Sequence, residues 1–379
     1  MKVAWLVPGF SSDEADWCIP ALRDLASEVA QRCDLHIVAL HYPFRRDTYR
    51  AFGATVHSLG GANRGGAQTP ALWREAIRLI DTLRPDGLHA FWAYEPGVVA
   101  AWLASKIPVI IHLAGGELID LPDIKYGLRG KWYVRWLMQW ALNRARLVTA
   151  GSHYLIEIAE KFTGGREIVF APLGVPHGPH PPALTPSPHP LTPSPKGEGE
   201  LVILNVGSLE PVKDQAMLLQ AFKRVREAVP DARLIIAGQG RLEHDLRALS
   251  QELGVANRVD FAGEIAHDQL PALYRQAAVC VQSSRHEAQG MAMLEAAQQG
   301  VPLIGTAVGA IADLSPAVAV AVPVGDEVSL AQSVIDLLRD PLRRQRLGQA
   351  ARDSVAQEYA LSRATDRAMM MYEMMTSDE

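Results

Sequence analysis

The sequence predicts an α/β protein of two domains, each an open sheet of buried strands with helices between them. Short apolar runs alternate with helical stretches in two series, one over residues 1–172 and one over residues 201–358. Between the series, residues 173–200 are rich in proline and contain Leu-Thr-Pro-Ser-Pro twice. This segment has too few apolar side chains to offset the entropy cost of ordering, so we predict a disordered linker or insertion there.

Length and composition agree with this organisation. The 379 residues suit two domains of ordinary size, and the hydrophobic content of 48% is enough for two cores. A net charge of −5 argues against a nucleic-acid surface, so no nucleic-acid partner is expected. The three cysteines form no close-spaced motif, the N-terminal apolar run is too short for a signal peptide, and no apolar run approaches a membrane span of about 20 residues. We therefore predict a cytoplasmic location.

The first series supplies six strand candidates. They are Val3–Val7, Leu35–Leu40, Gly87–Ala90, Val109–His112, Leu147–Ala150 and Ile168–Ala171. Gly9 follows the first strand and would give a substrate loop room to move; a plain turn is the alternative. At the other end of the chain, a helix is predicted over residues 359–375. Its methionine-rich run indicates packing into an irregular groove or, alternatively, an adhesive surface.

The second series contains glycine loops at its strand ends. Residues 201–207 form an apolar strand ending in Gly207, and the following loop carries Ser208 and Lys213. Gly207 permits close approach of the backbone, and Lys213 is placed to direct its ammonium group at a diphosphate. The next strand, residues 233–237, is again followed by a glycine turn at Gly238 and Gly240. Because the carboxyl ends of neighbouring strands form the ligand site of an open α/β sheet, these loops are expected to converge.

Two glutamates eight residues apart flank the predicted start of a helix. The order is buried strand, Glu287, Gly290, then a helix that begins at Met291 and Ala292 and carries Glu295. Free N–H groups near the helix start favour a phosphate, Glu295 would accept hydrogen bonds from a diol such as ribose, and Glu287 would reach a second polyol. A phosphate between two polyols describes a nucleotide-sugar. The alternative is chance spacing, with a glutamate that only complements the helix dipole.

In their order and spacing, these residues resemble glycosyltransferase family 4, the retaining, nucleotide-sugar-dependent enzymes of the "glycosyl transferases group 1" type. The motifs are the Gly207 to Lys213 loop, the Gly238/Gly240 turn, Phe261-Ala-Gly-Glu264, Leu270-Pro-Ala-Leu-Tyr274, the Glu287/Glu295 pair and Gly300-Val-Pro302. The resemblance implies the GT-B fold. In that fold, two Rossmann-like domains face each other across a cleft and a C-terminal helix, here within residues 359–379, packs back on the first domain.

The resemblance also implies roles for individual residues. Lys213 would neutralise the donor diphosphate, Glu295 would bind the ribose, and Glu287 would contact the transferred sugar. His112 would lie in the cleft near that sugar, although a hydrogen-bonded structural histidine is the alternative. His112, Glu287 and Lys213 are thus the catalytic candidates. The further donor contacts are Gly9, Gly207, Ser208, Gly238, Arg285, Gly290, Met291 and Ala292.

One departure from the family pattern concerns the diphosphate. The family usually has a basic residue where this chain has Ser208, and a hydroxyl cannot replace the fixed charge of a guanidinium. Arg285 or Arg241 is a candidate for the missing charge. Each is equally explained as a solvated surface arginine.

The function predicted is transfer of a sugar from a UDP-, GDP- or other NDP-sugar to a sugar, lipid or small-molecule acceptor, as in polysaccharide or cell-envelope synthesis. The sequence offers no metal-ligand cluster and no Ser-His-Asp arrangement, so no metal or other cofactor is expected. Two alternatives stay open. A non-catalytic nucleotide-sugar scaffold would explain Ser208, and a nucleotide-sugar epimerase would need acids in the first domain that the sequence does not reveal.

A predicted helix over residues 130–145 carries Trp132, Trp136 and Trp140 among several basic residues. Tryptophan and cations on one helix suit an anionic membrane surface, which would place the protein peripherally on the inner membrane face. Alternatively, the tryptophans pack against the sheet of the first domain.

Overall fold

The computed structural model describes residues 1–16, 18–61, 69–176 and 201–376, and the chain forms two compact units. The first unit combines Met1–Pro176 with the chain from Tyr359 onward, and the second unit lies between these segments. Most of the predicted linker, residues 177–200, falls outside the described residues. The cleft that the GT-B resemblance implies between the two domains stays a prediction.

The first unit is built on an eight-stranded sheet with the order β10-β9-β6-β5-β1-β2-β4-β3. Only the edge strand β3 runs antiparallel to its neighbour. The strands are β1 (Lys2–Gly9), β2 (Asp34–Tyr42), β3 (Arg46–Ala51), β4 (Ala54–Leu59), β5 (Gly87–Phe91), β6 (Val109–Leu113), β9 (Leu147–Ala150) and β10 (Val169–Phe170), and a separate hairpin joins β7 (Asp120–Leu121) to β8 (Tyr126–Gly127). The six predicted strands are all present, because buried parallel strands read as continuous apolar runs.

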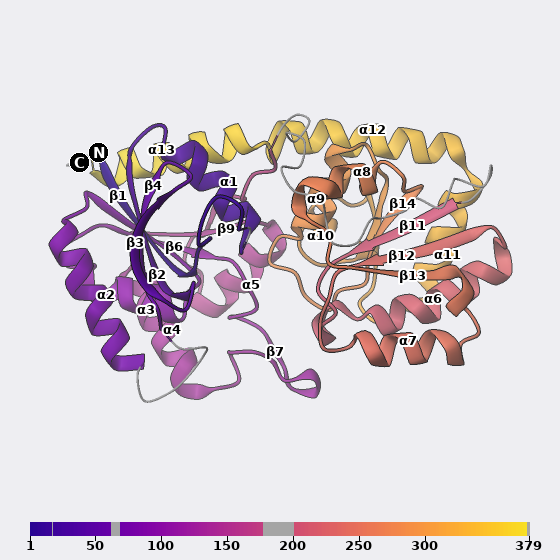
Figure 1. The fold of residues 1–379 in the computed structure, drawn as a ribbon, viewed down its shortest axis with the longest axis horizontal. Coiled ribbons are helices and arrows are strands. Elements are labelled where there is room, and N and C mark those ends of the chain that lie inside the picture. The colour runs from indigo at the N-terminus through magenta and orange to yellow at the C-terminus, as the bar shows by residue number, and fades with distance from the viewer. Residues whose placement is uncertain (17, 62–68, 177–200, 377–379) are drawn as a thin grey trace. The chain divides into compact units, whose positions relative to one another are not determined.

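Helices cover both faces of this sheet. They are α1 (Pro20–Val29), α2 (Thr69–Leu83), α3 (Glu95–Leu103), α4 (Trp132–Arg144), α5 (His153–Thr163) and the terminal α13 (Leu361–Thr376). Helices α1 and α13 lie side by side on one face, and α2 and α3 lie on the other (Figure 1). The sheet is therefore enclosed on both sides, as a parallel sheet requires.

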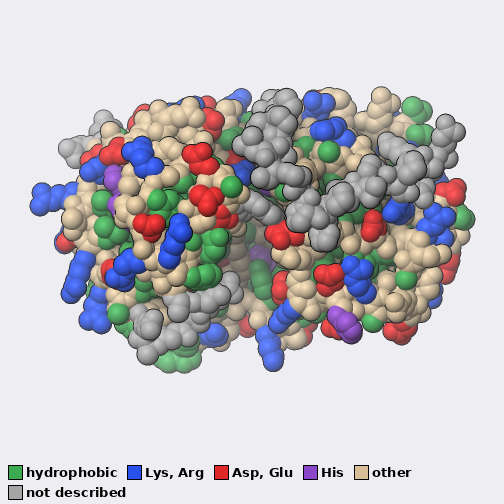
Figure 2. All heavy atoms as spheres, viewed as in Figure 1, with side chains coloured by type: hydrophobic (Ala, Val, Ile, Leu, Met, Phe, Trp, Pro, Cys, Tyr) green, Lys and Arg blue, Asp and Glu red, His purple; other side chains and the backbone are tan. Residues whose placement is uncertain are grey.

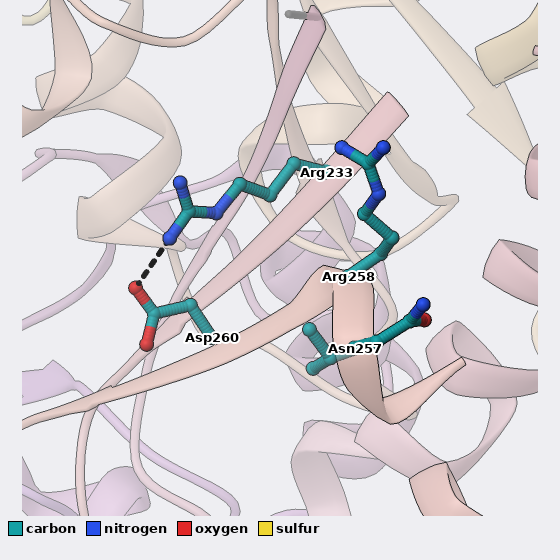
Figure 3. A pocket seen from close by; sticks show the side chains of 5 residues that line it. Arg233, Asn257, Arg258 and Asp260 are labelled. Atoms are coloured by element: carbon teal, nitrogen blue, oxygen red, sulfur yellow. Dashed lines mark hydrogen bonds and ion pairs between the residues drawn. The ribbon is translucent and has the colours of Figure 1, made fainter. Parts of the chain in front are cut away.

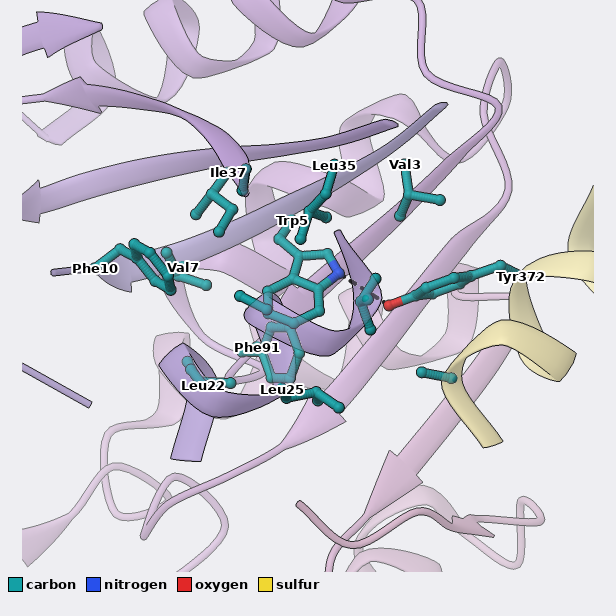
Figure 4. Packing of buried hydrophobic residues seen from close by; sticks show 14 of the residues in the cluster. Val3, Trp5, Val7, Phe10, Leu22, Leu25, Leu35, Ile37, Phe91 and Tyr372 are labelled. Atoms are coloured by element: carbon teal, nitrogen blue, oxygen red, sulfur yellow. Dashed lines mark hydrogen bonds between the residues drawn. The ribbon is translucent and has the colours of Figure 1, made fainter. Parts of the chain in front are cut away.

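The terminal helix α13 is part of the core of the first unit. Tyr372 and Trp5 are fully buried, and the Trp5 Nε1 group donates a hydrogen bond of 2.9 Å to the Tyr372 hydroxyl (Figure 4). The same hydroxyl lies 2.9 Å from His89 Nδ1. The prediction that the C-terminal helix packs back on the first domain is confirmed.

The second unit has a six-stranded sheet, all parallel, with the order β13-β12-β11-β14-β15-β16. Its strands are β11 (Leu201–Val206), β12 (Ala232–Ala237), β13 (Val259–Gly263), β14 (Val279–Gln282), β15 (Leu303–Thr306) and β16 (Ala319–Val322). The order reverses between β11 and β14, which makes the carboxyl ends of these two strands the expected ligand site.

Helices also flank the second sheet. They are α6 (Gln215–Ala228), α7 (Glu243–Glu252), α8 (Leu270–Tyr274), α9 (Met291–Gln298), α10 (Ala310–Leu314), α11 (Glu327–Arg339) and α12 (Pro341–Glu358). Helices α6, α7 and α11 lie on one face, and α8, α9 and α12 lie on the other. The predicted architecture of two α/β domains is thus confirmed.

Two side-chain expectations have a mixed outcome. Trp132 and Trp136 are 81% and 61% exposed, so the alternative in which the tryptophan stripe packs against the sheet is wrong for these two residues. Helix α4 instead buries Val134, Met138, Ala141 and Leu142. In the methionine-rich run of α13, Met371 and Met375 are buried, as the groove-packing interpretation predicts, whereas Met370 and Met374 are exposed.

The surface charges are mixed. Figure 2 shows basic and acidic side chains interspersed over the visible face of the described residues. An extended field of one sign, the electrostatic mark of nucleic-acid binding, is not seen on that face. Among the described residues, no helix is both long and apolar enough to cross a bilayer.

Candidate functional site

The candidate donor site lies at the carboxyl ends of β11, β12 and β14 in the second unit. Gly207 follows β11 directly, and its N–H donates to the carbonyl oxygen of Ala237 at 2.9 Å. Ser208 is exposed in the same loop. A short 3-10 turn, η2 (Pro211–Lys213), then brings Lys213 back toward the strand ends.

Gly238 is required by close contact between two loops. Its backbone has φ +141°, and a Cβ atom built on it would lie 2.0 Å from the carbonyl oxygen of Gly207. No side chain fits there without moving the Gly207 backbone. Gly207 itself differs, because the nearest atom to a Cβ built on it is a side-chain carbon of Lys213 at 3.9 Å. The Gly238 turn thus packs against the loop that begins at Gly207. The space beside the Gly207 Cα atom is open.

Lys213 and Glu287 form an ion pair at the centre of the site. Lys213 Nζ lies 2.6 Å from Glu287 Oε1, and the two side chains are 26% and 13% exposed. The Ser284 hydroxyl donates to the same carboxylate oxygen at 2.6 Å. Since an ammonium has three donors, Lys213 can hold Glu287 and still contact phosphate oxygens.

The loops that carry this ion pair are bonded to each other. The Ser283 hydroxyl donates to the carbonyl oxygen of Lys213 at 2.8 Å. The backbone N–H of Arg285 donates to the carbonyl oxygen of Val212 at 2.7 Å. The relative position of Lys213 and Glu287 is therefore fixed by the backbone as well as by their charges.

Helix α9 begins beside the ion pair. Gly290 caps it with φ +90°, and Met291 and Ala292 form its first turn, where N–H groups have no acceptor within the helix. The buried Gln282 side chain lies against Gly290, and its Nε2 atom has no partner among the described residues. These donors and the positive end of the helix dipole favour an anion at this point.

Glu295 lies about one turn inside α9 and is held by two buried side chains. The Tyr274 hydroxyl donates to Glu295 Oε2 at 2.9 Å, and His267 Nε2 lies 3.1 Å from Oε1. The carboxylate retains further lone pairs, as binding of a diol requires.

The two arginines considered as substitutes for a charge at position 208 both have acidic neighbours. Arg241 forms an ion pair of 3.0 Å with Glu210, two residues beyond Ser208. The charge of Arg285 acts on Asp214, where it opposes the burial that raises the pKa of that carboxyl. Arg241 therefore lies beside the loop that carries Ser208, and Arg285 lies beside the start of α6.

The residues predicted in the first unit occupy strand ends of the other sheet. Gly9 ends β1, where a Cβ atom would approach Tyr42 Cβ to 2.9 Å. His112 lies in β6, is 2% exposed, and has its Nδ1 atom 2.9 Å from the Thr149 hydroxyl. Burial lowers the pKa of His112 to about 4, so its ring is neutral near pH 7. A neutral histidine suits an orienting role better than that of a proton carrier at that pH.

His112 should make stability depend on pH between about 6.5 and 4. The unfolded chain takes up this proton near the ordinary pKa of 6.5, whereas the folded chain takes it up only near 4. The stabilisation is therefore present above pH 6.5 and is lost as the pH falls toward 4. As the pH falls over this range, the free energy of unfolding measured with denaturant should decrease by up to about 3 kcal/mol more for wild type than for His112→Asn.

His244→Asn provides the matched control for this measurement, because the His244 side chain is 95% exposed. This variant should follow the wild-type pH profile. Parallel profiles for wild type and His112→Asn would contradict the buried, neutral state of His112.

Sequence reasoning did not assign a role to Ser284, Tyr274 or His267. Tyr274 ends the quoted Leu270-Pro-Ala-Leu-Tyr segment, and Ser284 precedes Glu287 by three residues. His267 had no signal, because its link to Glu295 spans 28 residues. Contacts of this kind appear only in the folded chain.

A separate pocket of about 320 Å³ lies near the amino ends of strands in the second sheet, whereas the candidate donor site lies at the carboxyl ends (Figure 3). It is lined by Arg233, Asn257, Arg258, Val259 and Asp260, near the starts of β12 and β13. Arg233 is paired with Asp260 at 3.3 Å, so part of its charge is already balanced. None of the predicted site residues lines this pocket. In the described part of the chain, no cluster of three His, Cys, Asp or Glu side chains is arranged to hold a metal ion.

Comparison with known proteins gives matches to both halves of the chain. The model described as "Glycosyltransferase Family 4" matches residues 21–178, and "Glycosyl transferases group 1" matches residues 192–354. A GDP-mannose-dependent monoacylated alpha-(1-6)-phosphatidylinositol monomannoside mannosyltransferase of Corynebacterium glutamicum is 35% identical over 160 residues, which cover 40% of this chain and 42% of that protein. N-acetyl-alpha-D-glucosaminyl L-malate synthase of Bacillus anthracis is 28% identical over 46% of each chain. The matches thus span less than half the length of these relatives.

Solved structures match over nearly the whole length. Sucrose-phosphate synthase from Thermosynechococcus elongatus has a TM-score of 0.80 at 17% identity and covers 99% of both chains. Anabaena Alr3699/HepE in complex with UDP and glucose has a TM-score of 0.74 at 18% identity, covering 98% of this chain and 99% of that one. At such low identity these matches establish the fold alone.

Proposed function

The chain belongs to the GT-B glycosyltransferases of the group 1 and family 4 type, and from this premise we propose that it transfers a sugar from a nucleoside-diphosphate-sugar to an acceptor. The observation that carries the proposal is the grouping of Lys213, Glu287 and the start of α9 at one edge of the second sheet. A cation and free N–H groups suit a diphosphate, and carboxylates on either side suit sugar hydroxyls. The structural neighbour crystallised with UDP and glucose supports this class of donor.

In the proposed reaction, the bond between the sugar C1 and the β-phosphate oxygen breaks, and the acceptor oxygen bonds to C1. Lys213 and the first N–H groups of α9 stabilise the charge that develops on the departing diphosphate. The acceptor proton passes to a phosphate oxygen of this leaving group, so that no separate base is required. Attack on the face that the diphosphate leaves retains the anomeric configuration, as the family resemblance implies.

The Lys213 and Glu287 pair gives these two residues linked tasks. Both hydrogen bonds to Glu287 reach Oε1, which leaves Oε2 to accept from a hydroxyl of the transferred sugar. Lys213 then contacts the diphosphate while it holds Glu287 in place. We propose that Ser208 contributes one hydroxyl hydrogen bond and that Arg241, in the adjacent turn, contributes the part of its charge that Glu210 does not balance.

A panel of nucleotides tests the proposal most directly. We expect UDP, GDP, ADP or TDP to raise the melting temperature, and the matching nucleotide-sugar to release its diphosphate when an acceptor is supplied. Binding without turnover would instead support a scaffold, and release of a free epimer without acceptor would support an epimerase. If none of these nucleotides or their sugars binds, the proposal is wrong.

We further propose that α4 docks the first unit on an anionic membrane, consistent with a peripheral, cytoplasmic-side location and a lipid-linked acceptor. Trp132, Trp136 and Trp102 are 81%, 61% and 61% exposed. The ring centroids of Trp102 and Trp140 lie 5.4 Å apart, with the two rings tilted by 56°, so the aromatic surface extends onto α3. Exposed basic residues lie in α4 or close to it in the sequence, namely Lys125, Arg129, Lys131, Arg135, Arg144 and Arg146. Exposed indole rings together with basic residues match the headgroup region of an anionic bilayer.

Vesicle sedimentation provides the test of docking. The protein should sediment with phosphatidylglycerol vesicles at low salt, sediment less as salt rises, and stay in solution with phosphatidylcholine vesicles. The double variant Trp132→Ala, Trp136→Ala should bind at least tenfold more weakly, because two indole rings are removed from the interface. Leu342→Ala is the matched control, since Leu342 is 70% exposed in the second unit. Equal sedimentation of wild type and double variant contradicts docking through α4.

A further inference from the structure

We propose that Tyr274 and His267 are positioning residues that hold the Glu295 carboxylate in the orientation that binds the ribose diol of the donor. This inference rests on the proposed function, because it assumes that a nucleotide occupies the site. It assigns two residues to a task that the sequence pattern does not indicate.

The two side chains approach Glu295 from different elements. Tyr274 ends α8 and donates to Oε2 at 2.9 Å. His267 lies in the short turn η4 (His267–Gln269), and its Nε2 atom lies 3.1 Å from Oε1. A carboxylate oxygen can only accept, so Nε2 carries the proton in this bond. With one bond at each oxygen, the plane of the carboxylate is fixed.

Burial distinguishes the supporting residues from the one that they support. Tyr274 is 1% exposed, whereas the His267 and Glu295 side chains are 8% and 17% exposed. Glu295 is thus the most accessible member of the group. Burial, reinforced by the neighbouring Glu295 charge, raises the pKa of Tyr274 well above its usual value, so its hydroxyl stays protonated and remains a donor.

This arrangement lowers the entropic cost of binding a diol, because the Glu295 side chain is ordered before the ligand arrives. A free glutamate loses side-chain entropy when it is fixed by a ligand, whereas Glu295 is already fixed by its neighbours. Each carboxylate oxygen retains a lone pair for one hydroxyl, which matches the two acceptors that vicinal ribose hydroxyls need. Without its two partners, Glu295 would have to be ordered at the moment of binding.

The test compares nucleotides with and without the diol. UDP, GDP and ADP are each paired with their 2′,3′-dideoxy analogue, and Kd is measured by calorimetry for both members of the pair. Wild type should prefer the hydroxylated member by roughly tenfold or more, the size of hydrogen bonds to a charged group. Tyr274→Phe should weaken binding of the hydroxylated member only, so that the ratio of the two Kd values falls toward one.

Two further comparisons separate positioning from a general loss of stability. Tyr372→Phe removes a buried hydroxyl with a 2.9 Å hydrogen bond in the first unit, and it should keep the wild-type ratio. His267→Leu should lower the ratio, whereas His267→Gln, which retains an N–H donor, should restore most of it. The two His267 variants also provide the answer if Tyr274→Phe does not fold.

The outcomes distinguish failure of this inference from failure of the proposed function on which it rests. If wild type binds none of UDP, GDP, ADP and TDP, the proposed function itself fails. If wild type binds and prefers the hydroxylated member, but Tyr274→Phe and His267→Leu keep the wild-type ratio, the function stands and the positioning role is wrong. If wild type binds both members equally, Glu295 does not form hydrogen bonds with the ribose hydroxyls that strengthen binding, and the inference is likewise wrong.

Discussion

Replacing Lys213 with alanine is expected to lower kcat/KM for sugar transfer by roughly 10²- to 10³-fold, the usual cost of removing one group that stabilises charge in a transition state. The Lys213 ammonium group is bonded at 2.6 Å to Glu287, which precedes Gly290, the cap of α9, by three residues. The variant therefore loses the charge that we propose faces the diphosphate, and it loses one of the two bonds that hold Glu287 Oε1. Both kcat and donor affinity should fall.

Steady-state kinetics with the nucleotide-sugar identified by binding would measure this effect. Lys223→Ala is the matched control, because Lys223 is an exposed lysine of α6 in the same unit. Glu287→Gln gives the complementary pattern. It should lower kcat more than it weakens binding of the free nucleoside diphosphate, since Glu287 is assigned to the sugar. Wild-type kinetics for both Lys213→Ala and Glu287→Gln would exclude this site as the donor site.

Much of the fold could be predicted because its strands are buried on both faces. Strands such as β1 and β11 read as continuous apolar runs, and the glycines that follow them mark their ends. The β3 and β4 pair was not predicted. Three of the six residues of β3, Arg46–Ala51, are charged, and the strand lies at an exposed edge, so its pattern does not distinguish a strand from a loop. The helix over α4 was correctly expected, but its sequence did not show which side faces solvent.

The candidate site, like the fold, could be predicted from the sequence only in part. Lys213, Gly238 and Glu287 follow strands that end at one edge of a sheet, so topology alone brings them near each other. The contacts that orient them depend on the loops. Ser283 reaches the backbone of Lys213 across 70 residues, and Tyr274 reaches Glu295 across 21. No local periodicity encodes such contacts, and the bond between Trp5 and Tyr372, 367 residues apart, is equally hidden in the sequence.

Replacing Gly238 with alanine is expected to destabilise the second unit by about 2–4 kcal/mol and to abolish measurable donor binding. The added Cβ atom would lie 2.0 Å from the Gly207 carbonyl oxygen, and φ +141° is strained for any side chain. Relief of this contact requires the Gly207 backbone to move away from the strand end. Because the Lys213 loop begins at Gly207, the shift should also displace the residues that we propose contact the diphosphate. Chemical denaturation and calorimetry would measure the two effects.

Alanine substitutions at Gly254 and Gly207 are controls that distinguish backbone strain, steric clash and contact with the ligand. Gly254 has φ +73° with nothing within 4 Å of a built Cβ, so Gly254→Ala should cost only about 1 kcal/mol of backbone strain and leave donor binding unchanged. Gly207 does not have a positive φ, and a Cβ atom there meets only Lys213 carbons at 3.9 Å. Gly207→Ala should therefore fold normally yet bind the donor at least tenfold more weakly, because the methyl group occupies the space assigned to the diphosphate. If Gly207→Ala binds the donor as wild type does, the diphosphate does not approach this loop, and the loss in Gly238→Ala reflects misfolding alone.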